Sequence, residues 1–119
     1  MVYTDILNKN KDFLVLYKKG RSIVSKAVVI YFRQNGLPYN RFGITAGKKV
    51  GNAVMRNRAK RIIRQAYREN EIFFPIGLDI VFVARKFAAE VKSDYLCTYV
   101  KTHAICDIES FIGQEEKCK

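Results

Sequence analysis

The spacing of apolar and polar positions changes several times along the 119-residue chain, and each change predicts a new element. Residues 11–19 have helical spacing between Asn10, a residue type that caps helices, and Gly20, which stands where a left-handed residue ends a helix. Ser22 to Phe32 is rich in alternating β-branched and aromatic residues, and Arg41 to Ala46 resumes this pattern after a loop of turn-forming residues. We therefore expect a short helix followed by two or three strands.

The second half of the chain predicts a helix, a strand and a final helix. Gly51 to Glu69 contains no proline and no internal glycine and has helical apolar spacing, whereas Leu78 to Ala84 is a short and fully apolar strand. Ser93 can cap the last helix, whose apolar residues recur at four-residue steps at Leu96, Val100, Ala104 and Ile108. This order indicates one sheet with helices packed on it, an α+β or α/β sandwich.

Composition indicates a foldable basic protein. The chain has 22 Lys and Arg against 11 Asp and Glu, a net charge of +11, and 49% hydrophobic residues. Residues 1–92 hold 19 basic and 6 acidic groups, whereas residues 93–119 hold 3 and 5, so a polyanionic partner is expected on the first three quarters of the chain. Residues 1–119 are long enough for a single domain, and we expect residues 111–119 to be a frayed tail.

Several classes of protein are disfavoured by the same sequence. The apolar runs are far shorter than the roughly 20 residues of a membrane span, so we expect no membrane partner. The three cysteines are odd in number and lack a C-x-x-C pair, which favours a reducing, cytoplasmic setting. Gly43 to Lys49 superficially resembles a phosphate-binding P-loop, but only three residues separate its glycines where four are required, so no nucleotide or dinucleotide cofactor is expected.

The strongest functional signal is a one-sided run of basic residues in the expected second helix. It contains no acidic residue and eight basic ones: Lys48, Lys49, Arg56, Arg58, Lys60, Arg61, Arg64 and Arg68. Four of these form a row at four-residue steps, where like charges repel by about 0.2 to 0.5 kcal/mol per pair. A phosphate backbone would neutralise this row, and the glycine-led start of the helix adds backbone N–H groups for an anion. The alternative is a merely solvated basic surface.

This region also carries a family resemblance. The string GKKVGNAVMRNRAKRIIR, from Gly47 to Arg64, closely resembles the signature of the protein subunit of bacterial ribonuclease P. Asp12 to Tyr17 and Val83 to Lys86 are similar to further parts of that family. The resemblance implies an α-β-β-β-α-β-α sandwich, with a four-stranded sheet and a left-handed βαβ crossover, as in the second domain of ribosomal protein S5.

The resemblance further implies that an RNA subunit performs the chemistry. With bound magnesium, ribonuclease P RNA would hydrolyse precursor tRNA at the mature 5′ end, while this chain binds that RNA and the 5′ leader. The sequence offers little catalytic chemistry of its own, because His103 is its single histidine and no carboxylate lies between Lys26 and Arg68. We expect no catalytic residue and no metal site in the chain. A structural RNA-binding protein, such as a ribosomal component, is the alternative.

The expected binding residues fall into two groups. The RNA-binding group takes in the basic run and two asparagines: Lys48, Lys49, Asn52, Arg56, Asn57, Arg58, Lys60, Arg61, Arg64 and Arg68. By resemblance, the leader-binding group is Phe13, Tyr17, Tyr31, Arg85 and Lys86, with Lys48 and Lys49 flanking the same groove. Aromatic rings beside cations can stack unpaired bases, at about 1 to 3 kcal/mol per base. For Tyr31, a place in the groove and a place in the core stay equally open.

Overall fold

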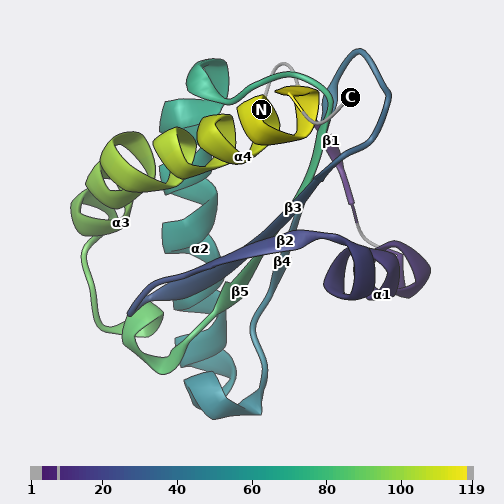
Figure 1. Cartoon of the computed structure of the whole chain (residues 1–119). Helices are drawn as coiled ribbons and strands as arrows, with labels where there is room; N and C mark the ends of the chain where they lie inside the picture. The colour runs from purple at the N-terminus through teal and green to yellow at the C-terminus, as the bar shows by residue number, and fades with distance from the viewer. Residues whose placement is uncertain (1–3, 8, 118–119) are drawn as a thin grey trace.

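The chain forms an α+β fold, and the computed structural model describes residues 4–7 and 9–117 (Figure 1). The elements expected from the sequence are all present, with one additional strand and several short helical turns. In chain order the elements are β1 (Thr4–Ile6), α1 (Asn10–Lys19), β2 (Arg21–Val24), β3 (Val28–Gln34), β4 (Asn40–Thr45), η1 (Lys48–Val50), α2 (Ala53–Asn70), η2 (Glu71–Phe73), β5 (Leu78–Ala84), η3 (Lys86–Ala89), α3 (Ser93–Tyr99), the π-turn η4 (Val100–Ala104) and α4 (Ile105–Lys117).

The sheet has five strands in the order β1-β4-β5-β3-β2, so the expectation of four strands is wrong. The additional strand, β1, pairs in parallel with β4, and its alignment places Thr4 opposite Asn40. The pairing extends one residue further, because the Leu7 N–H donates to the Phe42 carbonyl at 2.8 Å. A strand of three residues is too short to display alternation, which is why the pattern of the sequence did not indicate it.

Helices cover both faces of the sheet (Figure 1). Strands β4 and β5 are adjacent and parallel, and α2 runs between them, which makes the expected βαβ crossover; its left hand stays a prediction. Helices α2, α3 and α4 lie on one face over the main core, and α1 lies on the other face. The small core under α1 consists of Leu7, Leu16 and Val81. Among the described residues, no helix is long and apolar enough to cross a membrane.

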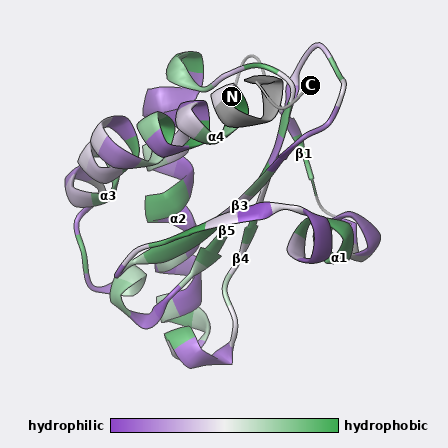
Figure 2. Ribbon diagram, viewed as in Figure 1, coloured by the Kyte–Doolittle hydropathy of each residue, from purple (hydrophilic) through white to green (hydrophobic). Residues whose placement is uncertain are grey.

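Helix α2 is amphipathic, as predicted (Figure 2). Its buried side is made of Ala59, Ile63, Ala66 and Tyr67, and along the ribbon hydrophobic and hydrophilic sections alternate. The Tyr67 ring stacks on Phe42 of β4, with ring centroids 4.1 Å apart, so the helix is fixed firmly against the sheet. The other sides of α2 face α3, η3 and solvent.

The C-terminal helices confirm one expectation and correct another. The four-residue steps from Leu96 to Ile108 all point into the core, where each of these side chains is fully buried. Ser93 is the first helical residue, so Lys92 holds the N-cap position expected for the serine. Helix α4 runs to Lys117, and the fraying expected from residue 111 stays a prediction. The Phe111 ring lies 5.8 Å from the Phe32 ring and thereby ties this helix to the sheet.

Gly20 ends α1 for a reason different from the one expected. Its φ of −80° and ψ of 168° are extended rather than left-handed, so any residue could adopt this backbone. A Cβ atom there would lie 2.5 Å from the Leu16 carbonyl oxygen and 3.0 Å from that of Phe32. Glycine is therefore required by the close approach of two backbone segments.

Replacing Gly20 should accordingly destabilise the fold. We expect Gly20→Ala to lower the free energy of unfolding by about 1 to 3 kcal/mol, the usual cost of overpacking. Gly113→Ala is the control, because a Cβ atom at Gly113 in α4 meets no atom within 4 Å. That change should raise stability by up to about 1 kcal/mol through helix propensity. Urea denaturation measures both, and a Gly20→Ala protein as stable as the parent would contradict the steric explanation.

Candidate nucleic-acid interface

Within the part of the chain that the structure describes, the cations of α2 form no ion pair with a carboxylate. Between described residues, the ion pairs involve Arg41, which contacts Asp79 at 2.6 Å and Asp12 at 3.9 Å, and none involves a cation of α2. The carboxylate of α2 itself, Glu69, instead accepts hydrogen bonds from Gln65 Nε2 at 2.6 Å and from Cys97 Sγ at 2.9 Å. The bond with Cys97 lowers the pKa of Glu69 and raises the pKa of the thiol.

The surface positions of these cations suit an external anion. Arg58, Arg61, Arg64 and Arg68 are exposed, whereas Arg56 and Lys60 are half-buried. The Nε atom of Arg56 is buried and has no hydrogen-bond partner among the described residues. A buried donor without a partner costs free energy, and a phosphate oxygen that accepts its hydrogen would remove that cost.

Two asparagines expected to bind RNA have different surroundings. Asn52 caps α2, because its side-chain oxygen accepts a hydrogen bond from the Met55 N–H at 3.0 Å. The side-chain oxygen is therefore bonded to the helix backbone, and the amide hydrogens of Asn52 take no part in this bond. Asn57 is exposed on α2 between Arg56 and Arg58. At the start of α2, where the sequence predicts an anion site, one backbone N–H group is thus already bonded to the Asn52 side chain.

The three aromatic candidates form one cluster. The rings of Phe13 and Tyr17, four residues apart on α1, are stacked with centroids 6.5 Å apart. Tyr17 also meets Tyr31 of β3 edge to face at 4.8 Å. All three residues are partly exposed. Tyr31 packs against the small core and is also in contact with solvent. The structure therefore brings together residues that the sequence separates by up to 18 positions.

A groove at the edge of β4 connects this cluster with the basic helix. Strand β1 pairs with β4 only as far as Phe42, so the edge of β4 is uncovered from Gly43 onward. The hollow there has a volume of about 310 Å³, and we call it the β4-edge groove. It is lined by apolar residues and two cations of α2, principally Leu7, Phe13, Phe42, Ile44, Lys60 and Arg64. An aromatic ring and two cations thus share one hollow although α1 and α2 lie on opposite faces of the sheet.

Gly43 is a residue of this groove that the sequence analysis did not select. A Cβ atom at Gly43 would lie 2.7 Å from the Phe13 ring and 2.6 Å from the Leu7 carbonyl oxygen. The absence of a side chain therefore allows Phe13 to lie directly on β4. A glycine inside an apolar strand is itself a signal of close approach, so the sequence contained the clue.

The remaining basic candidates gather where β4 and β5 end. Because these strands are parallel, the turns that follow them leave the sheet at the same end and pack together: η1, which contains Lys48 and Lys49, and η3, which begins at Lys86. Arg85 is partly committed to the fold, since its Nη1 donates to the Ser25 carbonyl at 2.8 Å.

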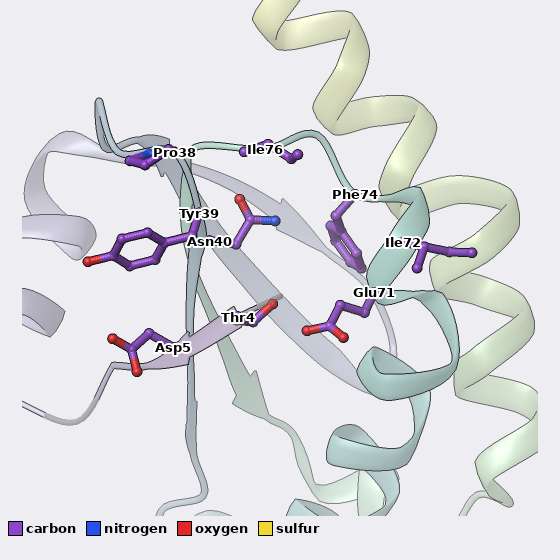
Figure 3. A pocket seen from close by; sticks show the side chains of 9 residues that line it. All are labelled: Thr4, Asp5, Pro38, Tyr39, Asn40, Glu71, Ile72, Phe74 and Ile76. Atoms are coloured by element: carbon purple, nitrogen blue, oxygen red, sulfur yellow. The ribbon is translucent and has the colours of Figure 1, made fainter. Parts of the chain in front are cut away.

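A larger hollow lies at the far end of the sheet and has the opposite electrostatic character (Figure 3). It has a volume of about 660 Å³, and the carboxyl groups of Asp5 and Glu71 stand among the rings of Tyr39 and Phe74 on its walls. The described residues that line it include no Lys or Arg. A phosphate would be repelled here, so size alone does not indicate where a nucleic acid binds.

No His, Cys, Asp or Glu stands among the described residues that line the β4-edge groove. Among all described residues, no His, Cys, Asp and Glu side chains form a group of three or more that could hold a metal ion. His103 is exposed in the η4 turn, where it stacks on Tyr99 with ring centroids 5.7 Å apart. Cys97 and Cys106 are both free thiols, and Cys118 lies outside the described residues. The chemistry that the site offers is binding of anions by its cations and stacking of planar groups on its aromatic rings.

Cations on one helix, a groove and a bordering cluster of aromatic rings are together typical of a protein that binds nucleic acid. Comparison with known proteins identifies the family. Residues 1–105 match the family model described as Ribonuclease P. The ribonuclease P protein component of Alkaliphilus metalliredigens is 51% identical over 79 residues, which cover 66% of this chain and 71% of that protein.

Solved structures give the same result. The Staphylococcus aureus RNase P protein superposes with a TM-score of 0.73 at 31% identity, covering 92% of this chain and 96% of that one. The Thermotoga maritima RNase P protein has a TM-score of 0.71 at 36% identity, covering 79% and 89%. This chain belongs to the ribonuclease P protein family, the protein subunits of the endoribonuclease holoenzyme that processes the 5′ ends of tRNA. The alternative of a ribosomal component is not supported.

Proposed function

We propose that this chain binds ribonuclease P RNA and the 5′ leader of precursor tRNA together, and so assists removal of the leader by the RNA subunit. The observation that carries this proposal is the set of α2 cations that no carboxylate in the described chain neutralises. Such a surface gains affinity for phosphates by releasing the counterions condensed on RNA. The family to which the chain belongs supplies the identity of the RNA.

The leader is assigned to the β4-edge groove and the aromatic cluster beside it. Phe13, Tyr17 and Tyr31 offer ring surfaces for unpaired bases, while Lys60 and Arg64 lie within reach of the phosphates. Stacking on a ring is tolerant of base identity because every base has a π-face. This arrangement therefore suits leaders of varied sequence.

We place the catalytic magnesium mainly on the RNA subunit. The binding surfaces of this chain carry several unpaired cations, which repel a divalent cation rather than hold it. By neutralising phosphates, the same cations reduce the amount of magnesium that the RNA requires. We also propose a cytoplasmic location, where precursor tRNA is processed in bacteria. The left-handed crossover and the likeness to the second domain of ribosomal protein S5 stay part of this proposal.

The most direct prediction concerns cleavage. Added to ribonuclease P RNA and precursor tRNA at low magnesium, the purified chain should increase the rate of 5′ cleavage and the affinity for precursor. The physical reason is that its cations replace part of the magnesium that screens phosphate repulsion. Gel analysis of labelled precursor measures both. If neither quantity rises above that of the RNA alone, the proposal is wrong.

The aromatic cluster should affect precursors only when they bear a leader. We expect Phe13→Leu and Tyr17→Leu each to reduce the affinity for leader-bearing precursor by about 5- to 150-fold, equivalent to one lost stacking contact. Leucine retains apolar packing but removes the ring. The control is Phe73→Leu, because Phe73 is half-exposed but lies in η2, away from this cluster. Equal losses for precursor and mature tRNA would indicate a folding defect instead.

Salt dependence should report the phosphate contacts of the groove. Arg64→Gln should flatten the slope of log affinity against log salt by about 0.7 for leader-bearing precursor, the value for one phosphate contact on a single strand. Lys101→Gln removes the same charge from the η4 turn, beside Phe73, and should leave the slope unchanged. An unchanged slope in Arg64→Gln would show that this guanidinium faces only solvent.

A further inference from the structure

Helix α1 carries two rings of the aromatic cluster, yet few contacts hold it on the sheet. It has ten residues, and isolated helices of that length are only marginally stable in water. Among the side chains of α1 that the structure describes, only Leu16 is buried, and it shares its small core with Leu7 and Val81. The N-cap residue, Lys9, makes no side-chain hydrogen bond to the first turn. These contacts therefore fix the first turn of α1 only weakly.

A guanidinium connects this first turn to the sheet. Arg41 of β4 donates to Asp79 of β5 through Nε at 2.7 Å and through Nη2 at 2.6 Å, so both oxygens of this carboxylate are engaged. The remaining nitrogen, Nη1, lies 3.9 Å from Asp12 Oδ2 in the first turn of α1. One side chain thus joins two neighbouring strands to the helix.

The carboxylate that holds Arg41 is itself fixed. Asp79 is 8% exposed, and its Oδ1 also accepts a hydrogen bond from Asn35 Nδ2 at 3.0 Å. A planar guanidinium that is bound through two of its nitrogens has a set orientation, so the third nitrogen is placed toward Asp12. Arg41 therefore differs from the cations of α2, which form no ion pair between described residues.

The ion pair lies next to the contact that places the Phe13 ring. Asp12 and Phe13 are consecutive residues of α1. Arg41 and Gly43 are two residues apart in β4, so both face the same side of the sheet, toward α1. Phe13 lies against Gly43, where a Cβ atom would be 2.7 Å from its ring. A shift of the first turn away from Arg41 would therefore also move this ring out of the β4-edge groove.

We infer that Arg41 is a positioning residue for leader binding. Held by Asp79, it keeps Asp12 close to the sheet, and the Phe13 ring is thereby kept in place for an unpaired base. Arg41 acts without touching the leader, because its three nitrogens face carboxylates of the chain. A ring that is held in its binding position beforehand loses less conformational freedom on binding, which raises affinity. This inference rests on the proposed function, since it takes the leader as the ligand of the groove.

The charge of Asp12 makes the inference testable, because two explanations predict opposite signs. A carboxylate beside the groove repels the phosphates of a leader, so its removal should strengthen leader binding if Asp12 acts through charge alone. If Asp12 acts through Arg41, its removal should weaken leader binding. We expect Asp12→Asn to reduce the affinity of the holoenzyme for leader-bearing precursor by about 2- to 5-fold, the effect of one exposed ion pair. The affinity for mature tRNA should stay unchanged.

Three further variants accompany Asp12→Asn in holoenzyme assembled with ribonuclease P RNA. Asp12→Glu keeps the charge and can reach across the 3.9 Å gap, so it should restore the parent's affinity. Arg41→Lys keeps a charge beside Asp79 but lacks the fork that spans both carboxylates, so it should match Asp12→Asn. Asp107→Asn is the control and should match the parent, because Asp107 stands in the first turn of α4, on the other face of the sheet (Figure 1).

A double-mutant cycle with Phe13→Leu tests whether the ion pair acts through the ring. Once the ring is absent, Asp12→Asn should cause no further loss of leader affinity. The inference is overturned if Asp12→Asn binds leader-bearing precursor as tightly as the parent or more tightly, if Asp12→Glu restores nothing, if the two losses add, or if mature tRNA loses as much. If the parent itself raises neither cleavage nor the affinity for precursor, the proposed function fails, and the two failures are thereby distinguished.

Discussion

The organisation of this protein depends on a helix that must bury one side and leave several like charges unpaired on the others. The buried side of α2 packs on the sheet through Tyr67 and Ile63. This contact determines which side of the helix each cation occupies. Repulsion within the row costs a few tenths of a kcal/mol per pair, which the core offsets easily. The fold is therefore stable without a ligand. A bound phosphate would remove the repulsion between the cations of α2 and so stabilise the protein further.

The sheet determines what stands beside these charges. Because β1 is short, the edge of β4 stays open, and Gly43 lets the Phe13 ring lie against it. Because β4 and β5 are parallel, η1 and η3 leave at one end and add further lysines there. Backbone geometry therefore places aromatic and basic side chains from distant parts of the sequence around the same helix.

The sequence predicted long periodic elements well and contacts between remote segments of the chain poorly. The amphipathic side of α2 and the inward positions of α3 and α4 repeat over several turns, so their spacing was sufficient to identify them. Strand β1 and the packing of Phe111 depend on partners remote in sequence, and no local pattern records them. For the site, the residue types were predictable, but the groove that joins Phe13 of α1 to Lys60 and Arg64 of α2 forms at the open edge of β4 and required the structure.

The central claim is that RNA phosphates, rather than acids of the chain, neutralise the arginines of α2. Arginine Nε–Hε signals in NMR spectra test it directly, with Arg41 as an internal reference because its Nε already donates to Asp79 at 2.7 Å. On addition of ribonuclease P RNA together with leader-bearing precursor tRNA, the signals of Arg56, Arg61 and Arg64 should shift and become protected from exchange, while that of Arg41 stays in place. Unchanged signals from these three arginines in an RNA-bound protein would contradict the account.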